Sequence, residues 1–137
     1  MMEQVNIKKI SMVLFCLYIL AVCILCFMKP DDLPQVERTF FGIPLDKVAH
    51  FLMFLPFTIL SGLSFVHKGC SLPKGLAVIA ILFIVGAGTA YGTEVIQAQT
   101  GYRAYEIGDF LADLTGLGTG TLLAALYLIF TTRTGNR

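Results

Sequence analysis

Four long apolar stretches constrain this chain more than any other feature of its sequence. They cover about residues 10–28, 46–66, 75–99 and 107–132. A helix that crosses about 30 Å of hydrocarbon needs about 20 mostly apolar residues, so each stretch is long enough for one crossing. Because lipid offers the backbone no hydrogen-bond partners, each crossing is expected to be helical. The sequence therefore predicts an all-α fold, a four-helix transmembrane bundle that forms one domain over residues 1–137.

The composition excludes several other classes of protein. Apolar residues make up 56% of the chain and charged residues only 14%, against about 25% charged residues in soluble domains. A chain of 137 residues has too little interior to hide that much apolar surface from water. The formal net charge of +1 provides no basic surface for a nucleic acid. We therefore exclude a soluble enzyme, a disordered chain and a nucleic-acid-binding protein.

The four cysteines indicate neither a disulfide scaffold nor a metal site. Cys16, Cys23 and Cys26 lie within the first apolar stretch, and Cys70 lies in a short polar turn. Cys23 and Cys26 have a metal-like spacing, but no histidine or acidic residue accompanies them there. We interpret the cysteines as apolar filler, and we predict neither a cofactor nor a resident metal.

The amino-terminal apolar stretch is predicted to be a membrane helix rather than a signal peptide. Lys8 and Lys9 precede it, as basic residues precede a signal sequence. The stretch is longer than a typical signal-peptide core, however, and no small-x-small cleavage site follows it. The connection after it, residues 29–45, is predicted to be an ordered surface loop or a short interfacial helix.

The lysines and arginines predict the orientation. With four crossings, the two termini share one side of the membrane with the connection between the second and third helices. That side carries six basic residues and the other side four: Lys8, Lys9, Lys68, Lys74, Arg133 and Arg137 against Lys29, Arg38, Lys47 and Arg103. Because basic residues are enriched on the cytoplasmic side, both termini are predicted to be cytoplasmic.

The ionisable residues at membrane depth gather at the opposite face, together with the polar residue Gln97. They lie at the start of the second helix, the end of the third, the connection after it and the start of the fourth. The set consists of Asp46, Lys47, His50, Glu94, Gln97, Arg103, Asp109 and Asp113. A charged side chain within hydrocarbon costs about 2.5–3.5 kcal/mol. We therefore interpret the set as a polar pocket open to one side, the alternative being a polar cluster that only joins three helices.

Small residues recur every four positions in the third and fourth stretches. Gly88 and Gly92 do so in the third, and Gly116 and Gly120 lie between Ala112 and Ala124 in the fourth. Such spacing lets helix backbones approach closely. We expect the third and fourth helices to form a tight hairpin, with the second helix packed against it.

The order of these motifs resembles the VanZ-like family of small bacterial membrane proteins. The resemblance rests on Asp46-Lys47-Val48-Ala49-His50-Phe51 with Phe54, on Glu94-x-x-Gln97, on Arg103, and on Asp109 with Gly116. It covers about residues 45–120. One departure is Asp113, where the family usually has Asn.

The resemblance implies a single VanZ-like domain in the plasma membrane of a bacterium. The family's namesake is associated with low-level resistance to the glycopeptide teicoplanin. On this basis we expect an extracytoplasmic polar pocket that binds an envelope lipid, a peptidoglycan precursor or a glycopeptide, with membrane lipids as partners. Lys47 and Arg103 would contact anionic headgroups, while His50 and Glu94 would orient polar groups.

Two other functions remain open from the sequence. One is an intramembrane enzyme acting on a lipid-linked substrate, with Glu94 or His50 as general base. A divalent ion held by Asp46, His50, Glu94 and Asp109 would be a variant of it, although no ligand spacing identifies such a site. The other is a proton-coupled carrier with Glu94 as the coupling residue. The oligomeric state is not predicted.

Overall fold

The computed structural model describes residues 2–27, 39–66, 69–101 and 106–134. Within these ranges the chain forms four helices, α1 (Met2–Phe27), α2 (Leu45–Phe65), α3 (Leu72–Gln99) and α4 (Ile107–Thr134). The all-α prediction is confirmed, and the predicted helix ends lie within a few residues of the observed ones, except that α1 begins at Met2 rather than near residue 10. Apolar length explains this agreement, because it is set by the bilayer and is readable from sequence.

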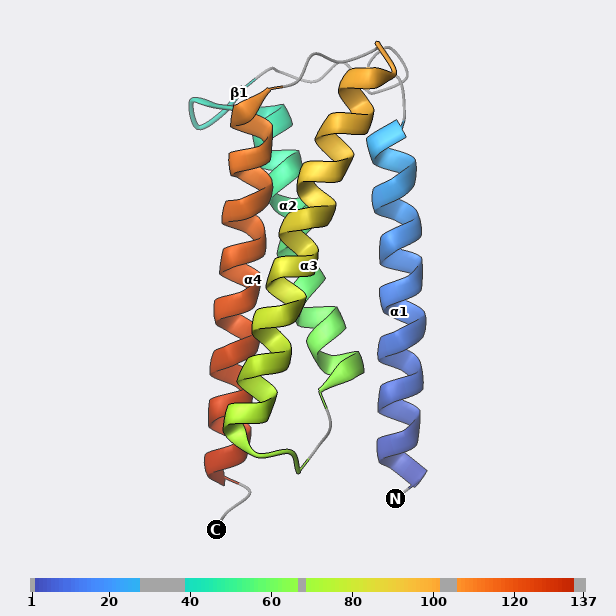
Figure 1. Cartoon of the computed structure of the whole chain (residues 1–137), viewed down its shortest axis with the longest axis vertical. Coiled ribbons are helices and arrows are strands. Elements are labelled where there is room, and N and C mark those ends of the chain that lie inside the picture. Colours follow the sequence, from blue (N-terminus) through green and yellow to red (C-terminus); the bar gives the residue numbers. More distant parts are fainter. Residues whose placement is uncertain (1, 28–38, 67–68, 102–105, 135–137) are drawn as a thin grey trace.

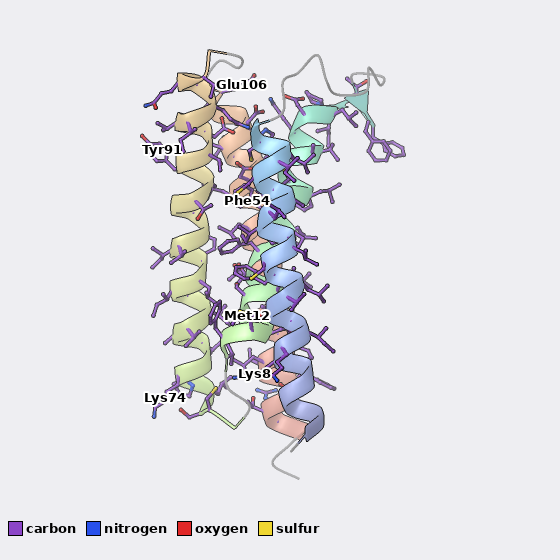
Figure 2. All side chains as sticks on the ribbon, turned by 90° about the vertical axis from the view of Figure 1, so that its right-hand side faces the viewer. Lys8, Met12, Phe54, Lys74, Tyr91 and Glu106 are labelled. Atoms are coloured by element: carbon purple, nitrogen blue, oxygen red, sulfur yellow. The ribbon has the colours of Figure 1, made fainter. Side chains whose placement is uncertain are left out.

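All four helices are long and apolar enough to cross a membrane, so the chain is a multi-pass membrane protein. The amino and carboxyl termini lie at the same end of the bundle (Figure 1). Lys8 and Lys74 lie toward that end, whereas Glu106 lies at the other (Figure 2). The bundle therefore has one end with the termini and one end with the start of α2 and α4; we call the second the acidic end.

A small antiparallel hairpin precedes α2 at the acidic end. Its strands are β1 (Thr39–Phe40) and β2 (Ile43–Pro44), with Phe40 opposite Ile43. Gly42 takes a φ of 80° in the turn, and Phe41 beside it takes a φ of 51°, a left-handed conformation that is uncommon for a bulky residue. The described part of the first connection is thus a hairpin, not the short helix that the sequence allowed.

The closest helix packing joins α2 to α4. A Cβ atom added at Gly116 would overlap the carbonyl oxygen of Phe51, and one added at Gly120 would overlap that of Leu55. Backbones can come this near only where a glycine lacks a side chain. The small residues of α4 therefore serve the contact with α2, and α2 and α4 form the most extensive helix pair.

The expected hairpin of α3 and α4 is present, since a Cβ atom added at Gly86 of α3 would lie 2.7 Å from Leu117 Cδ1 of α4, but it is not the closest helix pair. The two helices do touch, but a Cβ atom added at Gly88 or Gly92 would meet nothing within 4 Å. Those glycines thus lie on an open face of α3. The period of small residues identified a helix face correctly on α4, but it did not identify the neighbouring helix.

The apolar core lies midway along the bundle, where Phe54, Phe57, Ala90 and Leu117 are buried together. Helix α1 covers one flank of this core. The Phe15 ring packs edge-on against the Phe57 ring, with centroids 5.8 Å apart. A closely packed apolar layer therefore lies next to the acidic end along the bundle.

Candidate functional site

The candidate site is formed where α2 and α4 begin and α3 ends. Asp46 lies in the first turn of α2 and Asp109 in the first turn of α4. Acidic residues suit these positions because a helix amino terminus carries partial positive charge. Glu94 lies in the last turns of α3 and is 2% exposed. Three helices thus bring their polar residues to one end of the bundle, as the sequence predicted.

Lys47 is the centre of an ion-pair network. Its Nζ lies 3.0 Å from Asp109 Oδ1, and 3.3 Å from both Asp46 Oδ2 and Glu106 Oε2. An ammonium group has three donors, so these three carboxylates can use all of them. Gly108 makes room for the lysine, since a Cβ atom there would lie 2.9 Å from Lys47 Cε.

His50 lies deeper and faces three carboxylates. Its side chain is 3% exposed, and Nδ1 lies 2.9 Å from Asp113 Oδ1, a hydrogen-bond distance. Nδ1 also lies 3.7 Å from Glu94 Oε1, and Nε2 lies 3.6 Å from Asp109 Oδ2. Asp109 therefore faces Lys47 with one oxygen and His50 with the other, which joins the two networks.

The combined network contains more acids than bases. Among the described residues it holds the basic groups of Lys47 and His50 and five carboxyl groups, those of Asp46, Glu94, Glu106, Asp109 and Asp113. Buried charges are tolerated when they are paired. Because carboxyl groups outnumber basic groups among these described residues, the residues can bind protons, cations or hydrogen-bond donors.

Gln97 lies at the same end of the bundle, but its side chain hydrogen-bonds to α1. Its Nε2 donates a hydrogen bond of 2.9 Å to the backbone carbonyl of Cys26 near the end of α1. The glutamine is 4% exposed. It therefore links α3 to α1, and among the described residues its side chain makes no hydrogen bond to the carboxyl cluster. Arg103, the remaining predicted residue, lies outside the described residues.

Glu106 is a member of the network that sequence reasoning missed. Its backbone carbonyl accepts hydrogen bonds from the N–H groups of Asp109 and Phe110, at the entrance to α4. A signal was present, because Glu106 lies three residues before Asp109 and so reaches the same turn.

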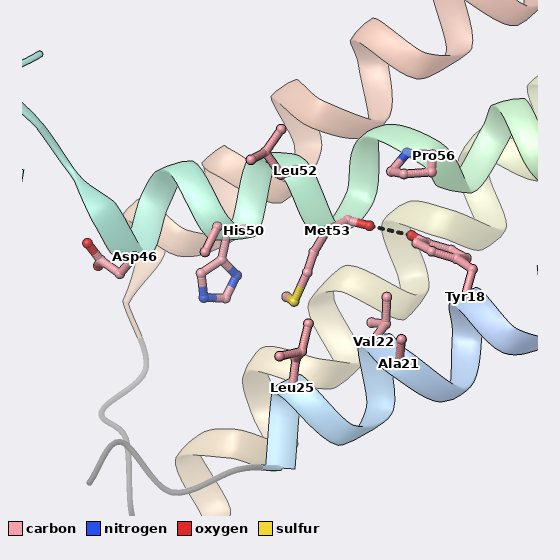
Figure 3. Close-up of a pocket in the computed structure, with 10 residues that line it drawn as sticks. Tyr18, Ala21, Val22, Leu25, Asp46, His50, Leu52, Met53 and Pro56 are labelled. Atoms are coloured by element: carbon pink, nitrogen blue, oxygen red, sulfur yellow. Dashed lines mark hydrogen bonds between the residues drawn. The ribbon is translucent and has the colours of Figure 1, made fainter. Parts of the chain in front are cut away.

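A cavity of about 410 Å³ lies between α1 and α2 (Figure 3). Asp46 and His50 line its end nearest the acidic residues. The rest of the lining is mostly apolar: Tyr18, Ala21, Val22 and Leu25 from α1, and Ala49, Leu52, Met53 and Pro56 from α2. The cavity thus has one polar end and one apolar end.

The apolar end of the cavity is held by a hydrogen bond between the two helices. The Tyr18 hydroxyl donates to the backbone carbonyl of Met53 (Figure 3). Pro56 lies one turn further along α2 and has no N–H to offer the helix, which leaves nearby carbonyls without their usual donor. The tyrosine therefore contributes a hydrogen bond at the turn where the helix is weakest.

Two groups of residues at this end have the donor types and spacing of a metal site. One ligand atom from each of His50, Glu94 and Asp109 lies within 4.8 Å of the other two. The same holds for Asp46, Glu106 and Asp109. The second group already surrounds the ammonium group of Lys47, which supplies its positive charge.

Comparisons of the chain with protein-family models, with curated proteins and with solved structures give no match.

Proposed function

We propose that this chain is a VanZ-like protein of the bacterial plasma membrane that binds an amphipathic envelope lipid. In this proposal the acidic end faces outward and both termini are cytoplasmic. The lipid's polar headgroup lies beside Asp46 and His50, and its hydrocarbon chain lies along α1 and α2. Of the ligand classes that the family resemblance suggests, this favours an envelope lipid or a lipid-linked peptidoglycan precursor.

The observation that carries the proposal is the divided character of the cavity. A soluble metabolite would need polar partners on all sides, whereas this cavity has ionisable side chains only at the end of Asp46 and His50, and the Tyr18 hydroxyl at the other end is bonded to the Met53 carbonyl. Ligand sites are typically apolar hollows with a few polar groups that fix orientation. An amphipathic molecule matches such a division along its own length.

The rim of the cavity supports a ligand that comes from the bilayer. Leu25 is 45% exposed and Leu52 is 56% exposed, and both line the cavity. In a membrane protein an exposed apolar side chain at this depth faces acyl chains. A lipid can therefore reach the cavity from the side.

Energetics also favour a functional interpretation of the acidic end. Hydrogen bonds between membrane helices contribute about 0.6 kcal/mol of stability on average. This is small beside the free-energy cost of burying the ionisable groups of His50, Glu94 and Asp113. Intramembrane ionisable groups are usually retained because they have a role. We expected Lys47 to bind an anionic headgroup. Its three carboxylate partners leave it poorly placed for that role.

Lipid analysis of purified protein tests the proposal. We expect native mass spectrometry to find a defined lipid class bound to the wild type. Ala49→Phe would fill the cavity and Asp46→Ala would remove a polar partner, so each should lower the occupancy of that lipid at least several-fold.

Ala80→Phe is the matched control, because Ala80 is exposed on α3 and does not line the cavity. It should keep the wild-type lipid. The same lipids at the same occupancy in wild type, Ala49→Phe and Asp46→Ala would contradict the proposal.

A further inference from the structure

The arrangement around His50 has a feature that lipid binding does not require. The imidazole nitrogens face different carboxylates of α4, with Nδ1 at 2.9 Å from Asp113 and Nε2 at 3.6 Å from Asp109. The first distance is a hydrogen bond, whereas the second is too long for one. The two sides of the ring are therefore in different environments.

The Asp113 contact determines which nitrogen can bind a cation. With Asp113 ionised, its Oδ1 accepts the hydrogen bond from His50 Nδ1–H, and in the neutral ring Nε2 then carries the lone pair. Histidines that bind metals commonly donate their other N–H to a carboxylate in this way. The lone pair of His50 is thus directed toward the side of the ring where Asp109 lies.

The spacing of the possible ligands fits an ion between them. Zinc bonds of about 2.0 Å in tetrahedral geometry separate two ligand atoms by about 3.3 Å, close to the 3.6 Å between His50 Nε2 and Asp109 Oδ2. Glu94 lies beside the same ring, with its Oε1 at 3.7 Å from His50 Nδ1, and one ligand atom from each of the three residues lies within 4.8 Å of the other two. All three side chains are buried.

A second observation concerns Asp113 and is independent of that spacing. Asp113 is fully buried, at 0% exposure, and its Oδ2 has no hydrogen-bond partner among the described residues. A carboxylate left in this state is costly unless positive charge lies near it. Lys47 contacts Asp46, Glu106 and Asp109, whereas the described base that contacts Asp113 is His50.

We propose that His50, Glu94 and Asp109 bind a divalent transition-metal ion, with Asp113 as a positioning residue that orients His50. One imidazole with carboxylates suits zinc or manganese. Three protein ligands leave a coordination position open, as in zinc sites that bind a further molecule. Because His50 also lines the cavity, the ion lies at the cavity's polar end. The inference does not rest on lipid binding, since the ligands are in place without an occupant.

Metal titration of delipidated protein in detergent tests the inference directly. Wild-type protein stripped with a chelator should bind Zn²⁺ or Mn²⁺ with one saturable site per chain. Glu94→Gln keeps the shape of the side chain but removes its charge, and it should weaken binding at least tenfold. Thr115→Val is the control, since Thr115 is exposed and its hydroxyl bonds to the carbonyl of Ala112 in its own helix; its affinity should equal that of the wild type.

The role of Asp113 is tested by two substitutions. Asp113→Leu removes the acceptor for His50 and should weaken binding about 10–100-fold without changing the stoichiometry. Asp113→Asn keeps an oxygen acceptor and should recover part of the affinity, which a purely structural role would not predict. Apo variants are compared by size exclusion, so that a loss of folding is recognised; if Glu94→Gln does not fold, Asp109→Asn takes its place.

Failure of the wild type to bind either ion saturably would overturn the proposal, as would wild-type affinity in Glu94→Gln. Either result can occur whether or not a lipid is bound in the native membrane. The metal site and the lipid proposal are therefore tested separately.

Discussion

The interface between α2 and α4 has two halves that are built in opposite ways. At the acidic end, Lys47 and His50 of α2 face the carboxylates of Asp109 and Asp113. Further along, the carbonyl oxygens of α2 lie so close to Gly116 and Gly120 that a side chain would not fit. One half uses long charged side chains, and the other brings the backbones together.

The difference separates the residues that hold α2 and α4 together from the residues that we assign to function. Close packing of small residues is the general means by which membrane helices associate, and the glycine half provides it without any charge. The ionic half buries His50 and Asp113 almost completely at a cost that packing does not require. We infer that stability depends mainly on the glycine half and function mainly on the ionic half.

The largest expected effect is at the glycine half. Gly116→Leu would push a side chain into the carbonyl of Phe51, so α2 and α4 must separate. Overpacking of this kind costs roughly 3 kcal/mol or more, and we expect thermal unfolding in detergent to show a large loss of stability. Gly88→Leu is the control, because nothing lies within 4 Å of a Cβ there; equal losses in both variants would contradict the inferred role of the α4 glycines.

A smaller effect is expected at Lys47. Lys47→Met removes the ammonium group from Asp109, whose side chain is only 10% exposed. Breaking a fully buried ion pair costs about 3–5 kcal/mol, and because the Lys47 side chain is 27% exposed we expect about 2 kcal/mol. Lys74→Met, at the opposite end, should have no measurable effect. A loss larger than that of Gly116→Leu would reverse the comparison between the two halves.

The smallest effect is expected at the polar contact within the glycine half. The Thr121 and Thr58 hydroxyls form a 3.0 Å hydrogen bond between the two helices, and Thr121 Oγ1 also lies 2.8 Å from the Leu117 carbonyl of its own helix. Thr58→Val removes this bond at nearly constant volume, and such bonds average about 0.6 kcal/mol. A double-mutant cycle with Thr121→Val isolates the coupling, with Thr89→Val as control because Thr89 bonds to its own helix. A coupling of several kcal/mol would show that the glycines are not the main support.

The gross fold was predictable because it depends on segment length and on alternation across the bilayer. Four apolar stretches fixed the helices to within a few residues, apart from the start of α1. Alternation alone placed His50, Glu94 and Asp109 at one end, since successive crossings reverse direction. Neither step requires knowledge of how the helices pack.

The contacts between particular helices could not be predicted. They depend on how each helix is rotated about its axis relative to its neighbours, and the 3.6-residue period of a sequence does not give that rotation. The small residues of α4 identified a face, but nothing in the sequence said that α2, and not α3, would meet it. Gln97 was assigned to the cluster on spacing, yet it turns toward α1 and bonds to Cys26. The cavity was missed because it forms between α1 and α2, and only Tyr18 interrupts the apolar character of that part of α1.

The proposed entry of a lipid past Leu25 and Leu52 has a consequence for any affinity measurement. A molecule that arrives there diffuses in the plane of one leaflet, so its abundance relative to other lipids governs how often it is bound. Occupancy should then follow mole fraction in the bilayer and be insensitive to dilution of the whole suspension. The two halves of the bilayer also become unequal, because only one of them supplies headgroups at the level of His50.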